Sequence, residues 1–257
     1  MSQPPLIVFT DLDGTLLDHR SYSPEAARPA LDRLARLGIP LILASSKTAA
    51  EIDLLRDEIG CRAFPAIVEN GAGILEATPD ADTGTYDRLR AALDEVPPAL
   101  RAQFTGFGDM GAAGVARATG LPPAAARLAA RRQFSEPGLW KGNAAMLASF
   151  RTSLAALGIS ARHGGRFLTL SFGGTKADRM AAIAARYGTP TSLALGDAPN
   201  DAEMIAAATH GVIVANPHGT PLPALPGEAT GQIRRTAAPG PEGWNDAVTA
   251  LLDEMNL

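Results

Sequence analysis

Short apolar runs alternate with helical patterns along the first part of the chain. Residues 6–8, 39–44 and 66–68 form runs too short for helices, and their nearly uniform apolar character is typical of strands buried on both faces. Residues 23–38 and 51–60 space their apolar side chains as amphipathic helices do, and each segment ends in a glycine. Strands and helices that alternate in this way predict parallel β-α-β units with right-handed crossovers.

A different pattern occupies the middle of the chain. Between about residues 79 and 170 the apolar runs shorten, and proline pairs and glycine-rich loops interrupt the helical pieces. The parallel pattern then resumes, and its expected elements are strands at 191–195 and 211–215 and an amphipathic closing helix at 244–255. We therefore expect an α/β core made of residues 1–82 and 171–257, with a separate small α+β domain inserted at 83–170.

Composition limits the classes of function that the chain can have. The 257 residues are 46% hydrophobic and 19% charged, which suits a globular protein with a real core. A net charge of −4 provides no sequence-wide basic field for nucleic acid, and the single cysteine, Cys61, cannot form an internal disulfide. No basic segment followed by an apolar run opens the chain, and no stretch approaches the roughly 20 apolar residues of a membrane span. We expect a cytoplasmic protein that binds neither nucleic acid nor membranes, and its oligomeric state stays open.

Two carboxylates follow the first predicted strand at alternate positions. Asp11 and Asp13 lie on the same side of an extended chain, because side chains alternate with period two. Two carboxylates this close repel each other, so that one takes up a proton unless a cation lies between them. The pair is therefore either a solvated Asp-rich turn or a nucleophile and an acid at a divalent metal.

Polar residues also end the other predicted strands of the core. Sites in parallel sheets form beyond the carboxyl ends of the strands, so these residues are candidates for one common site. They are Ser45, Ser46 and Lys47 after the second strand, Glu69 and Asn70 after the third, and Asp197, Asn200 and Asp201 after the strand at 191–195. Lys176 adds a cation at a predicted helix start.

This oxygen-rich residue set suits a hard cation such as Mg²⁺, which prefers oxygen ligands and keeps several waters. Asp11 and Asp197 can supply two carboxylates, with Asp201 as a third ligand or as an anchor for a bound water. No cluster of His or Cys residues in the sequence competes for a softer metal. Lys176 and the hydroxyl of Ser45 could hold phosphoryl oxygens and offset the charge on a transferring group.

Three segments of the middle section carry candidate chemistry. The glycine-rich segment 105–111 lacks the spacing of a nucleotide-binding loop, and we interpret it as a structural loop. Arg131 and Glu136 belong to a segment whose mixed charges fit either a surface ion pair or a clamp for an anionic substrate. Arg166 stands near the start of a strand that is entered through a glycine turn.

Four motifs resemble those of the haloacid dehalogenase-like superfamily of phosphotransferases: Asp11-Leu12-Asp13-Gly14-Thr15, Ser45 after an apolar strand, Lys176, and Gly196-Asp197-x-x-Asn200-Asp201. The resemblance implies a Rossmann-like parallel-sheet core with an inserted α+β cap. It also implies that Asp11 is a nucleophile that forms an aspartyl-phosphate, and that Asp13 is the general acid/base, with its backbone carbonyl on Mg²⁺. The implied catalytic set is Asp11, Asp13, Ser45 and Lys176, and the implied metal set is Asp11, Asp13, Asp197 and Asp201.

Further motifs, spread over nearly the whole chain, resemble those of mannosyl-3-phosphoglycerate phosphatases: Ser45-Ser46-Lys47-Thr48, Glu69-Asn70-Gly71, Gly106-Phe107-Gly108-Asp109-Met110, Arg131-x-x-Phe134-Ser135-Glu136-Pro137 and Gly164-Gly165-Arg166-Phe167. This resemblance implies a phosphatase that produces mannosylglycerate, a compatible solute. Such a substrate carries a carboxylate beside its phosphate, which arginines could bind, and sugar hydroxyls that need polar partners. The substrate-binding candidates are Ser46, Lys47, Asn70, Arg131, Ser135, Glu136, Arg166 and Asn200.

Three alternatives stay open. Thr175 and Ala177 flank Lys176 where the resemblance would place Asp and Gly, so glucosyl-3-phosphoglycerate or another sugar phosphate is an alternative substrate. A phosphomannomutase-like phosphotransferase would pass the phosphoryl group to a second alcohol instead of water. A phosphosugar-binding module without catalysis is a third class, although Asp11 and Asp13 are both present.

Overall fold

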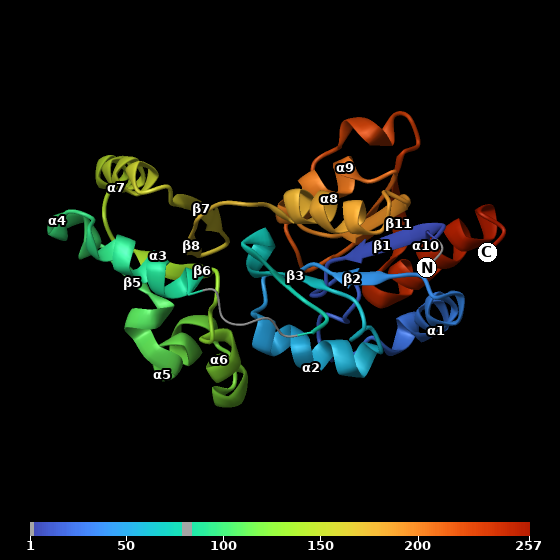
Figure 1. The fold of residues 1–257 in the computed structure, drawn as a ribbon, viewed down its shortest axis with the longest axis horizontal. Coiled ribbons are helices and arrows are strands. Elements are labelled where there is room, and N and C mark those ends of the chain that lie inside the picture. Colours follow the sequence, from blue (N-terminus) through green and yellow to red (C-terminus); the bar gives the residue numbers. More distant parts are fainter. Residues whose placement is uncertain (1–2, 79–83) are drawn as a thin grey trace. The chain divides into compact units, whose positions relative to one another are not determined.

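A computed structural model describes residues 3–78 and 84–257, and the chain divides into two compact units (Figure 1). The first unit comprises residues 1–45, 55–77 and 175–257, and the second comprises residues 46–54 and 78–174. The predicted boundary between residues 82 and 83 lies outside the described residues. The proposed limits of core and cap therefore stay a prediction, and each unit is described by itself.

A five-stranded parallel sheet is the framework of the first unit. Its strands, in spatial order, are β11 (Ile233–Pro239), β10 (His210–Ala215), β9 (Thr191–Gly196), β1 (Leu6–Thr10) and β2 (Leu41–Leu43). The chain begins in β1, moves outward through β2, and returns to the other side of β1 for the remaining strands. The predicted parallel α/β core is confirmed, and β1 is buried along its whole length at the point where the strand order reverses.

A short antiparallel pair continues this sheet beyond β2. β3 (Ala66–Val68) meets the end of β2 through a parallel bridge between Ala44 and Ile67, and the chain then turns back into β4 (Gly73–Leu75). Ser45, the next residue, donates its backbone N–H to Ile67 O at 2.9 Å. The third predicted strand therefore lies beside the second.

Helices cover both faces of the five-stranded sheet (Figure 1). On one face lie α8 (Lys176–Arg186) and α9 (Ala202–Ala207), and on the other lie α1 (Arg28–Leu37) and α10 (Gly240–Glu254). α2 (Ala49–Ile59) follows β2 and is shared between the two units. Because side chains alternate along β1, Ile7 and Phe9 pack among the residues of α8 and α9, while Thr10 faces α10.

Two helix starts differ from the predicted ones. Residues 25–27 form a 3-10 turn before α1, and Ser23 Oγ accepts a hydrogen bond from Glu25 N at 3.2 Å. α1 therefore begins at Arg28, later than the predicted residue 23. α10 begins at Gly240, earlier than the predicted residue 244. The end of α1 agrees with the prediction, since Gly38 adopts the left-handed conformation with φ of 64°.

A four-stranded antiparallel sheet is the framework of the second unit. Its strands, in spatial order, are β5 (Phe104–Gly106), β6 (Ser135–Trp140), β8 (Phe167–Ser171) and β7 (Ser160–Gly164). Its helices are α3 (Thr85–Asp94), α4 (Pro98–Arg101), α5 (Phe107–Thr119), α6 (Pro123–Ala129) and α7 (Ala144–Ala156). Leu89, Phe104, Phe150 and Leu168 belong to its main core. The predicted α+β character of the inserted domain is confirmed.

The glycine-rich segment 105–111 is not the structural loop that the sequence predicted. β5 ends at Gly106, and α5 begins directly after it. Asp109 accepts a hydrogen bond from Gly106 N at 2.9 Å, which caps the helix start. A Cβ at Gly106 would lie 2.0 Å from Glu136 Oε1. The glycine therefore makes room for a neighbouring carboxylate, and the loop interpretation is wrong.

The longest of the helices named above is too short to span a membrane. α10 has 15 residues, fewer than the roughly 20 apolar residues that a span requires. Within residues 3–78 and 84–257, no helix is long and apolar enough to cross a membrane. The expected cytoplasmic location stays a prediction.

Candidate active site

Three carboxylates converge beyond the carboxyl ends of the central strands β1 and β9. Asp11 follows β1, Asp197 follows β9, and Asp201 lies in the short 3-10 turn that comes next. One oxygen of each lies within 4.8 Å of the others, and all three residues are buried. The parallel register pairs Thr10 with Leu195 at the strand ends, so the residues that follow meet at one edge of the sheet.

Lys176 is the counterion of this cluster. Its Nζ donates to Asp11 Oδ1 at 2.6 Å and to Asp201 Oδ1 at 2.7 Å, and its side chain is 1% exposed. Thr175 Oγ1 accepts from Asp178 N at 3.1 Å and caps α8, so the helix begins at Lys176 itself. Burial lowers the pKa of Lys176, but the attraction of the two carboxylates outweighs burial and raises it. Burial raises the pKa of Asp11, and Lys176 opposes that rise.

Asp197 is held from two sides by neutral donors. Thr15 Oγ1 donates to its Oδ1 and Asn216 Nδ2 donates to its Oδ2, both at 2.7 Å. Gly14 leaves room for this arrangement, since its φ is 83° and a Cβ there would lie 2.5 Å from Asn216 Nδ2. Burial raises the pKa of Asp197, and the two hydrogen bonds oppose that rise. Sequence reasoning left Asn216 out of the site, although its place directly after a predicted strand was a usable signal.

The loop that carries Asp201 also orients it. Asp201 Oδ2 accepts hydrogen bonds from the backbone N–H groups of Asp197 and Ala198 at 3.3 and 3.1 Å. Gly196 permits the close approach, since a Cβ there would lie 2.4 Å from Asp201 Cβ. One oxygen of Asp201 is therefore bound to its own loop, while the other accepts from Lys176.

Asp13 and Ser45 occupy different positions in the first unit. Asp13 is half-buried in the turn after β1, where Gly14 N–H donates to Leu17 O at 3.1 Å. Ser45 is buried at the end of β2. Within the described part of the chain, the carboxylate cluster includes Asp11 but not Asp13. The sequence places Asp11 and Asp13 on the same side of the chain, but in the structure only the Asp11 carboxylate joins the cluster.

A turn of left-handed backbone conformation follows β3 at residues 69–71. Glu69, Asn70 and Gly71 have φ values of 52°, 58° and 89°. Asn70 N–H donates to Ser45 O at 2.9 Å, and Asn70 Oδ1 accepts from Asn200 Nδ2 at 3.2 Å. Such a conformation costs about 1–3 kcal/mol for each non-glycine residue and persists only where the surroundings fix it. The two predicted substrate-binding amides of the core are therefore side by side, and both residues are exposed.

Arg179, which sequence reasoning missed, ties the same turn to α8. Its Nε donates to Gly71 O at 2.9 Å, and its guanidinium also donates to Ala72 O at 3.2 Å. Gly71 lies so close to Thr175 that a Cβ would be 2.1 Å from the threonine carbonyl carbon. Since Arg179 lies about one turn beyond Lys176, these contacts fix the helix start that carries the lysine. Its sequence signal is weak, because an arginine on a helix is usually a surface residue.

Two predicted substrate residues stand where the chain passes between the units. Ser46 and Lys47 directly follow Ser45 but group with the second unit. Ser46 is exposed, and its backbone O accepts from Arg132 at 3.4 Å. Lys47 is half-buried. Their part in substrate binding stays a prediction.

The other predicted residues of the second unit differ in exposure. Arg131 is exposed between α6 and β6. Arg166 is exposed in the turn between β7 and β8, with its guanidinium 5.6 Å from the centre of the Phe167 ring. Ser135 is buried, and its Oγ accepts from Arg132 at 2.8 Å. The two exposed arginines keep guanidinium surface available to an anion.

Glu136 is fully buried, so of the two alternatives for its segment the surface ion pair is wrong for this residue. Its Oε1 accepts from Arg90 at 2.6 Å and from Gly108 N–H at 2.9 Å, and its Oε2 accepts from the Tyr86 hydroxyl at 2.7 Å. The reason is that β6 packs against α3, which carries both Arg90 and Tyr86. Burial raises the pKa of Glu136, and the hydrogen bond from Tyr86 opposes that rise.

The donor set of the carboxylate cluster fits a hard divalent cation. Three buried carboxylates offer oxygen atoms, and a single lysine offsets only part of their charge. Three negative charges and one positive charge leave −2 when all four groups are ionised, which one divalent cation would cancel. Among the described residues no His or Cys joins this cluster, which favours Mg²⁺ over softer metals.

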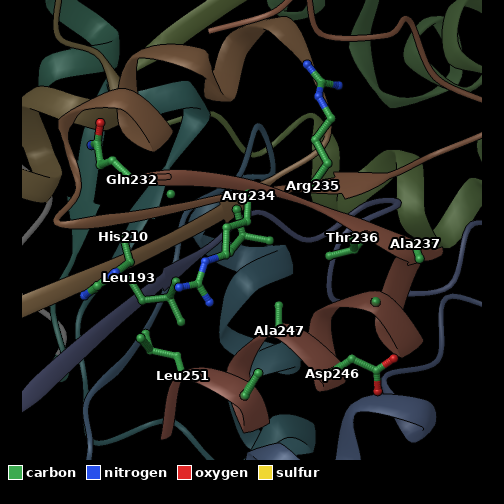
Figure 2. Close-up of a pocket in the computed structure, with 14 residues that line it drawn as sticks. Leu193, His210, Gln232, Arg234, Arg235, Thr236, Ala237, Asp246, Ala247 and Leu251 are labelled. Carbon is green, nitrogen blue, oxygen red and sulfur yellow. The ribbon is translucent and has the colours of Figure 1, made fainter. Parts of the chain in front are cut away.

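A cavity of about 280 Å³ lies elsewhere in the first unit, between the sheet and α10 (Figure 2). Figure 2 shows Ala247 and Leu251 of α10 on one side of it and Arg234 of β11 on the other. Arg234 is paired with Glu254 at 2.6 Å, so its charge is already balanced. The residues that line this cavity include none of the predicted site residues. Carboxylate geometry, and not this cavity, therefore locates the candidate site.

The fold and the site together define a class of protein. A parallel sheet in which a buried aspartate follows β1, beside a lysine and two further aspartates, has the parts of an aspartate-based phosphotransferase. Comparison with known proteins narrows the class: residues 8–90 match the haloacid dehalogenase-like hydrolase family. The chain is also 34% identical to the glucosyl-3-phosphoglycerate/mannosyl-3-phosphoglycerate phosphatase of Methanococcoides burtonii, over 97% of this chain and 98% of that protein. The chain belongs to the haloacid dehalogenase-like hydrolases, and the predicted phosphoric monoester hydrolase is confirmed.

Solved structures agree at the level of the fold. A Thermoplasma acidophilum protein superposes with a TM-score of 0.65 at 17% identity, covering 97% of this chain and 98% of that one. The sucrose-phosphatase of Synechocystis sp. PCC6803, solved with sucrose and phosphate, gives 0.62 at 15% identity, covering 96% and 97%. Identities this low show the shared fold alone, and the fold class predicted from the sequence is confirmed.

Proposed function

We propose that the chain is a Mg²⁺-dependent phosphatase that hydrolyses mannosyl-3-phosphoglycerate to mannosylglycerate and phosphate through an aspartyl-phosphate. The observation that carries the proposal is the similarity, over 97% of the chain, to a phosphatase named for this substrate. Glucosyl-3-phosphoglycerate is the second candidate, because the name of that relative includes it as well. Both esters present a phosphate, a carboxylate and a sugar.

In the proposed reaction, the Asp11 carboxylate attacks the phosphorus and displaces the alcohol. Asp13 donates a proton to the leaving oxygen, and then takes a proton from the water that hydrolyses the aspartyl-phosphate. Lys176 Nζ and the Ser45 hydroxyl would bind phosphoryl oxygens and offset the charge gathered there. The 2.6 Å contact between Lys176 and Asp11 supports this arrangement, since one ammonium can reach both the nucleophile and the group it attacks.

The metal in this proposal would be held by Asp11, Asp197, Asp201 and the backbone carbonyl of Asp13. When bound, Mg²⁺ would supply positive charge to the phosphoryl oxygens. Thr15 and Asn216 favour the ionised form of Asp197 through their hydrogen bonds, and so keep that ligand oriented. Lys176 favours the ionised form of Asp11 in the same way.

Residues outside the cluster would choose the substrate. The exposed guanidinium groups of Arg131 and Arg166 suit the glycerate carboxylate, which arginine forks bind well. Asn70 and Asn200 carry amides suited to hydroxyl or phosphoryl oxygens, and Ser46, Lys47 and Ser135 complete the proposed set. Glu136 has both oxygens engaged by Tyr86, Arg90 and Gly108, so we assign it a supporting role in that set.

A panel of phosphate esters tests the proposal. Phosphate release would be measured with water as the only acceptor, for both glycosyl-3-phosphoglycerates, 3-phosphoglycerate and common sugar phosphates. We expect a kcat/KM at least about tenfold higher for the glycosyl-3-phosphoglycerates, because only they present all three groups. Equal rates on esters without the carboxylate would refute the substrate assignment. Transfer to a second alcohol without phosphate release would favour the phosphotransferase instead.

The nucleophile is tested separately by Asp11→Asn. This variant should lose turnover on every ester, because an amide cannot form the aspartyl-phosphate, while substrate binding stays measurable by calorimetry. Asp32→Asn, on the exposed side of α1, is the matched control and should keep wild-type turnover. Turnover retained by Asp11→Asn would rule out the assignment of the nucleophile.

A further inference from the structure

A buried hydrogen-bond chain leads from α10 to the backbone of Asp11. Trp244 Nε1–H donates to Thr10 Oγ1 at 2.9 Å, and the Thr10 hydroxyl donates to Asp11 O at 2.7 Å. Trp244 and Thr10 are both fully buried. Neither residue belongs to the carboxylate cluster, and they lie far apart in the sequence, so the link exists only in the folded chain.

The hydroxyl of Thr10 accepts one hydrogen bond and donates another. It accepts from the indole and offers its only hydrogen to the Asp11 carbonyl, which fixes its rotamer. The backbone N–H of Asp11 donates to Leu195 O in β9 at 2.9 Å. Both backbone polar groups of Asp11 are therefore held, one by the neighbouring strand and the other by Thr10.

The start of α10 also lies near the turn that follows Asp13. A Cβ at Gly240 would lie 3.9 Å from Gly14 O, in ordinary van der Waals contact with the turn that follows Asp13. Asn245 Oδ1 accepts from Ala30 N at 3.1 Å and so anchors α10 to the start of α1. The first turns of α10 thus bond the end of β1 through Trp244 and are themselves fixed to a neighbouring helix.

We propose that Trp244 and Thr10 are positioning residues for Asp11. The indole fixes the hydroxyl, the hydroxyl fixes the carbonyl, and the Asp11 side chain keeps its place 2.6 Å from Lys176 Nζ. This inference rests on the proposed role of Asp11 as the nucleophile. Reacting groups need placement to within about 0.5 Å, and support from a helix is more exact than support from a loop.

The pair Thr10→Val and Thr10→Ser tests the chain. Valine keeps the shape of threonine without its hydroxyl, whereas serine keeps the hydroxyl. With p-nitrophenyl phosphate as the probe, kcat of Thr10→Val should fall about 10- to 100-fold below that of Thr10→Ser, which is the usual cost of losing such a support. KM should change little, because neither variant alters a group that contacts the ester.

A second pair, Trp244→Phe and Trp140→Phe, removes one indole N–H from each unit. Trp140 Nε1 is buried in the second unit and has no hydrogen-bond partner among the described residues, so its loss should leave kcat unchanged. Trp244→Phe should lower kcat, because the Thr10 hydroxyl loses the donor that orients it. If Thr10→Val does not fold, this pair decides alone. Thermal midpoints are measured for all four variants, and rates are taken well below the lowest of them.

The outcomes separate this inference from the proposed function. If the wild type is active and Thr10→Val matches Thr10→Ser in kcat, the inference fails and the proposed function stands. A lower thermal midpoint with unchanged kcat also overturns it, because the chain would then serve stability alone. A wild type that releases phosphate from no ester overturns the inference and the proposed function together. A drop in kcat confined to Thr10→Val and Trp244→Phe supports the inference.

Discussion

Replacement of Lys176 by methionine tests the electrostatics of the carboxylate cluster without any need for catalysis. The ammonium lies 2.6 Å from Asp11 and 2.7 Å from Asp201. An effective dielectric constant of about 20 gives about 6 kcal/mol of attraction for each contact, which desolvation of the buried groups largely offsets. Removing one partner of a buried ion pair costs about 3–5 kcal/mol, and we expect Lys176→Met to lose this much stability near pH 8 without divalent metal.

The loss should depend on pH in a direction that the structure determines. Burial raises the pKa of Asp11 and Lys176 opposes that rise, so the pKa rises further when the lysine is removed. A carboxyl group whose pKa is higher in the folded state contributes stability at low pH, and the contribution disappears as the pH rises through the folded-state pKa. The variant therefore takes up a proton on folding, and its deficit should shrink as the pH falls from about 8 towards about 5.

The assay is urea unfolding in a metal chelator at several values of pH. Lys141→Met, at an exposed position in the second unit, is the matched control and should change the free energy of unfolding by less than about 0.5 kcal/mol throughout. A deficit for Lys176→Met that is equal at about pH 5 and about pH 8 would refute the reasoning. So would a deficit no larger than that of the control.

Three further predictions concern stability and the metal. Burial would raise the pKa of Asp109, but the hydrogen bonds from Arg90, Arg101 and the Gly106 N–H together outweigh it and lower the pKa to about 2. The ionised Asp109 therefore stabilises the fold above about pH 4, and this stabilisation is lost as the pH falls towards 2. Thermal melts should show that Asp109→Asn lowers the free energy of unfolding by about 1 kcal/mol near neutral pH, after allowance for solvent screening. A deficit that stays constant down to about pH 2 would contradict this. Gly71→Ala should lower the free energy of unfolding in urea by about 3 kcal/mol, because its Cβ would lie 2.1 Å from Thr175. Gly60→Ala is the control, since Gly60 has a similar φ but no atom within 4 Å of its Cβ position, and it should cost only about 1 kcal/mol. Equal losses for the two variants would argue against the collision at Gly71. Removal of Mg²⁺ with a chelator should stop phosphate release and its return should restore it, and an unaffected rate would exclude the metal.

The framework of the site could be predicted because strand ends determine it. A strand that is buried on both faces has few other places in a parallel sheet, and its last residue fixes where the next side chains lie. Asp11 and Asp197 follow two such strands, so the hydropathy pattern alone was enough to predict that they lie at the same edge of the sheet. Lys176 was predicted at a helix start, and in the structure Thr175 and Asp178 cap that helix start.

The supports of the site could not be predicted, because they depend on the order of strands and on side-chain contacts. The position of Asn216 after β10 made it a candidate, but its hydrogen bond to Asp197 requires β10 to lie beside β9, which the sequence does not show. From the sequence, Arg179 would be expected at the surface. Its role becomes visible only in the structure, where the turn at residues 69–72 packs against α8 and accepts its hydrogen bonds. Glu136 stands near arginines in the sequence, yet its partner Arg90 comes from a helix 46 residues away.

The same distinction applies to the family motif itself. Residues 8–90 match the family and contain Asp11, but the groups that hold Asp11 in place come from the last third of the chain. They are Lys176 on its side chain, Leu195 on its backbone N–H, and Trp244, acting through Thr10, on its carbonyl. Under the proposed mechanism, residues 8–90 supply the nucleophile Asp11, while elements beyond them hold it in place. Under the proposed mechanism, variation at Trp244 would change the rate without altering any motif residue.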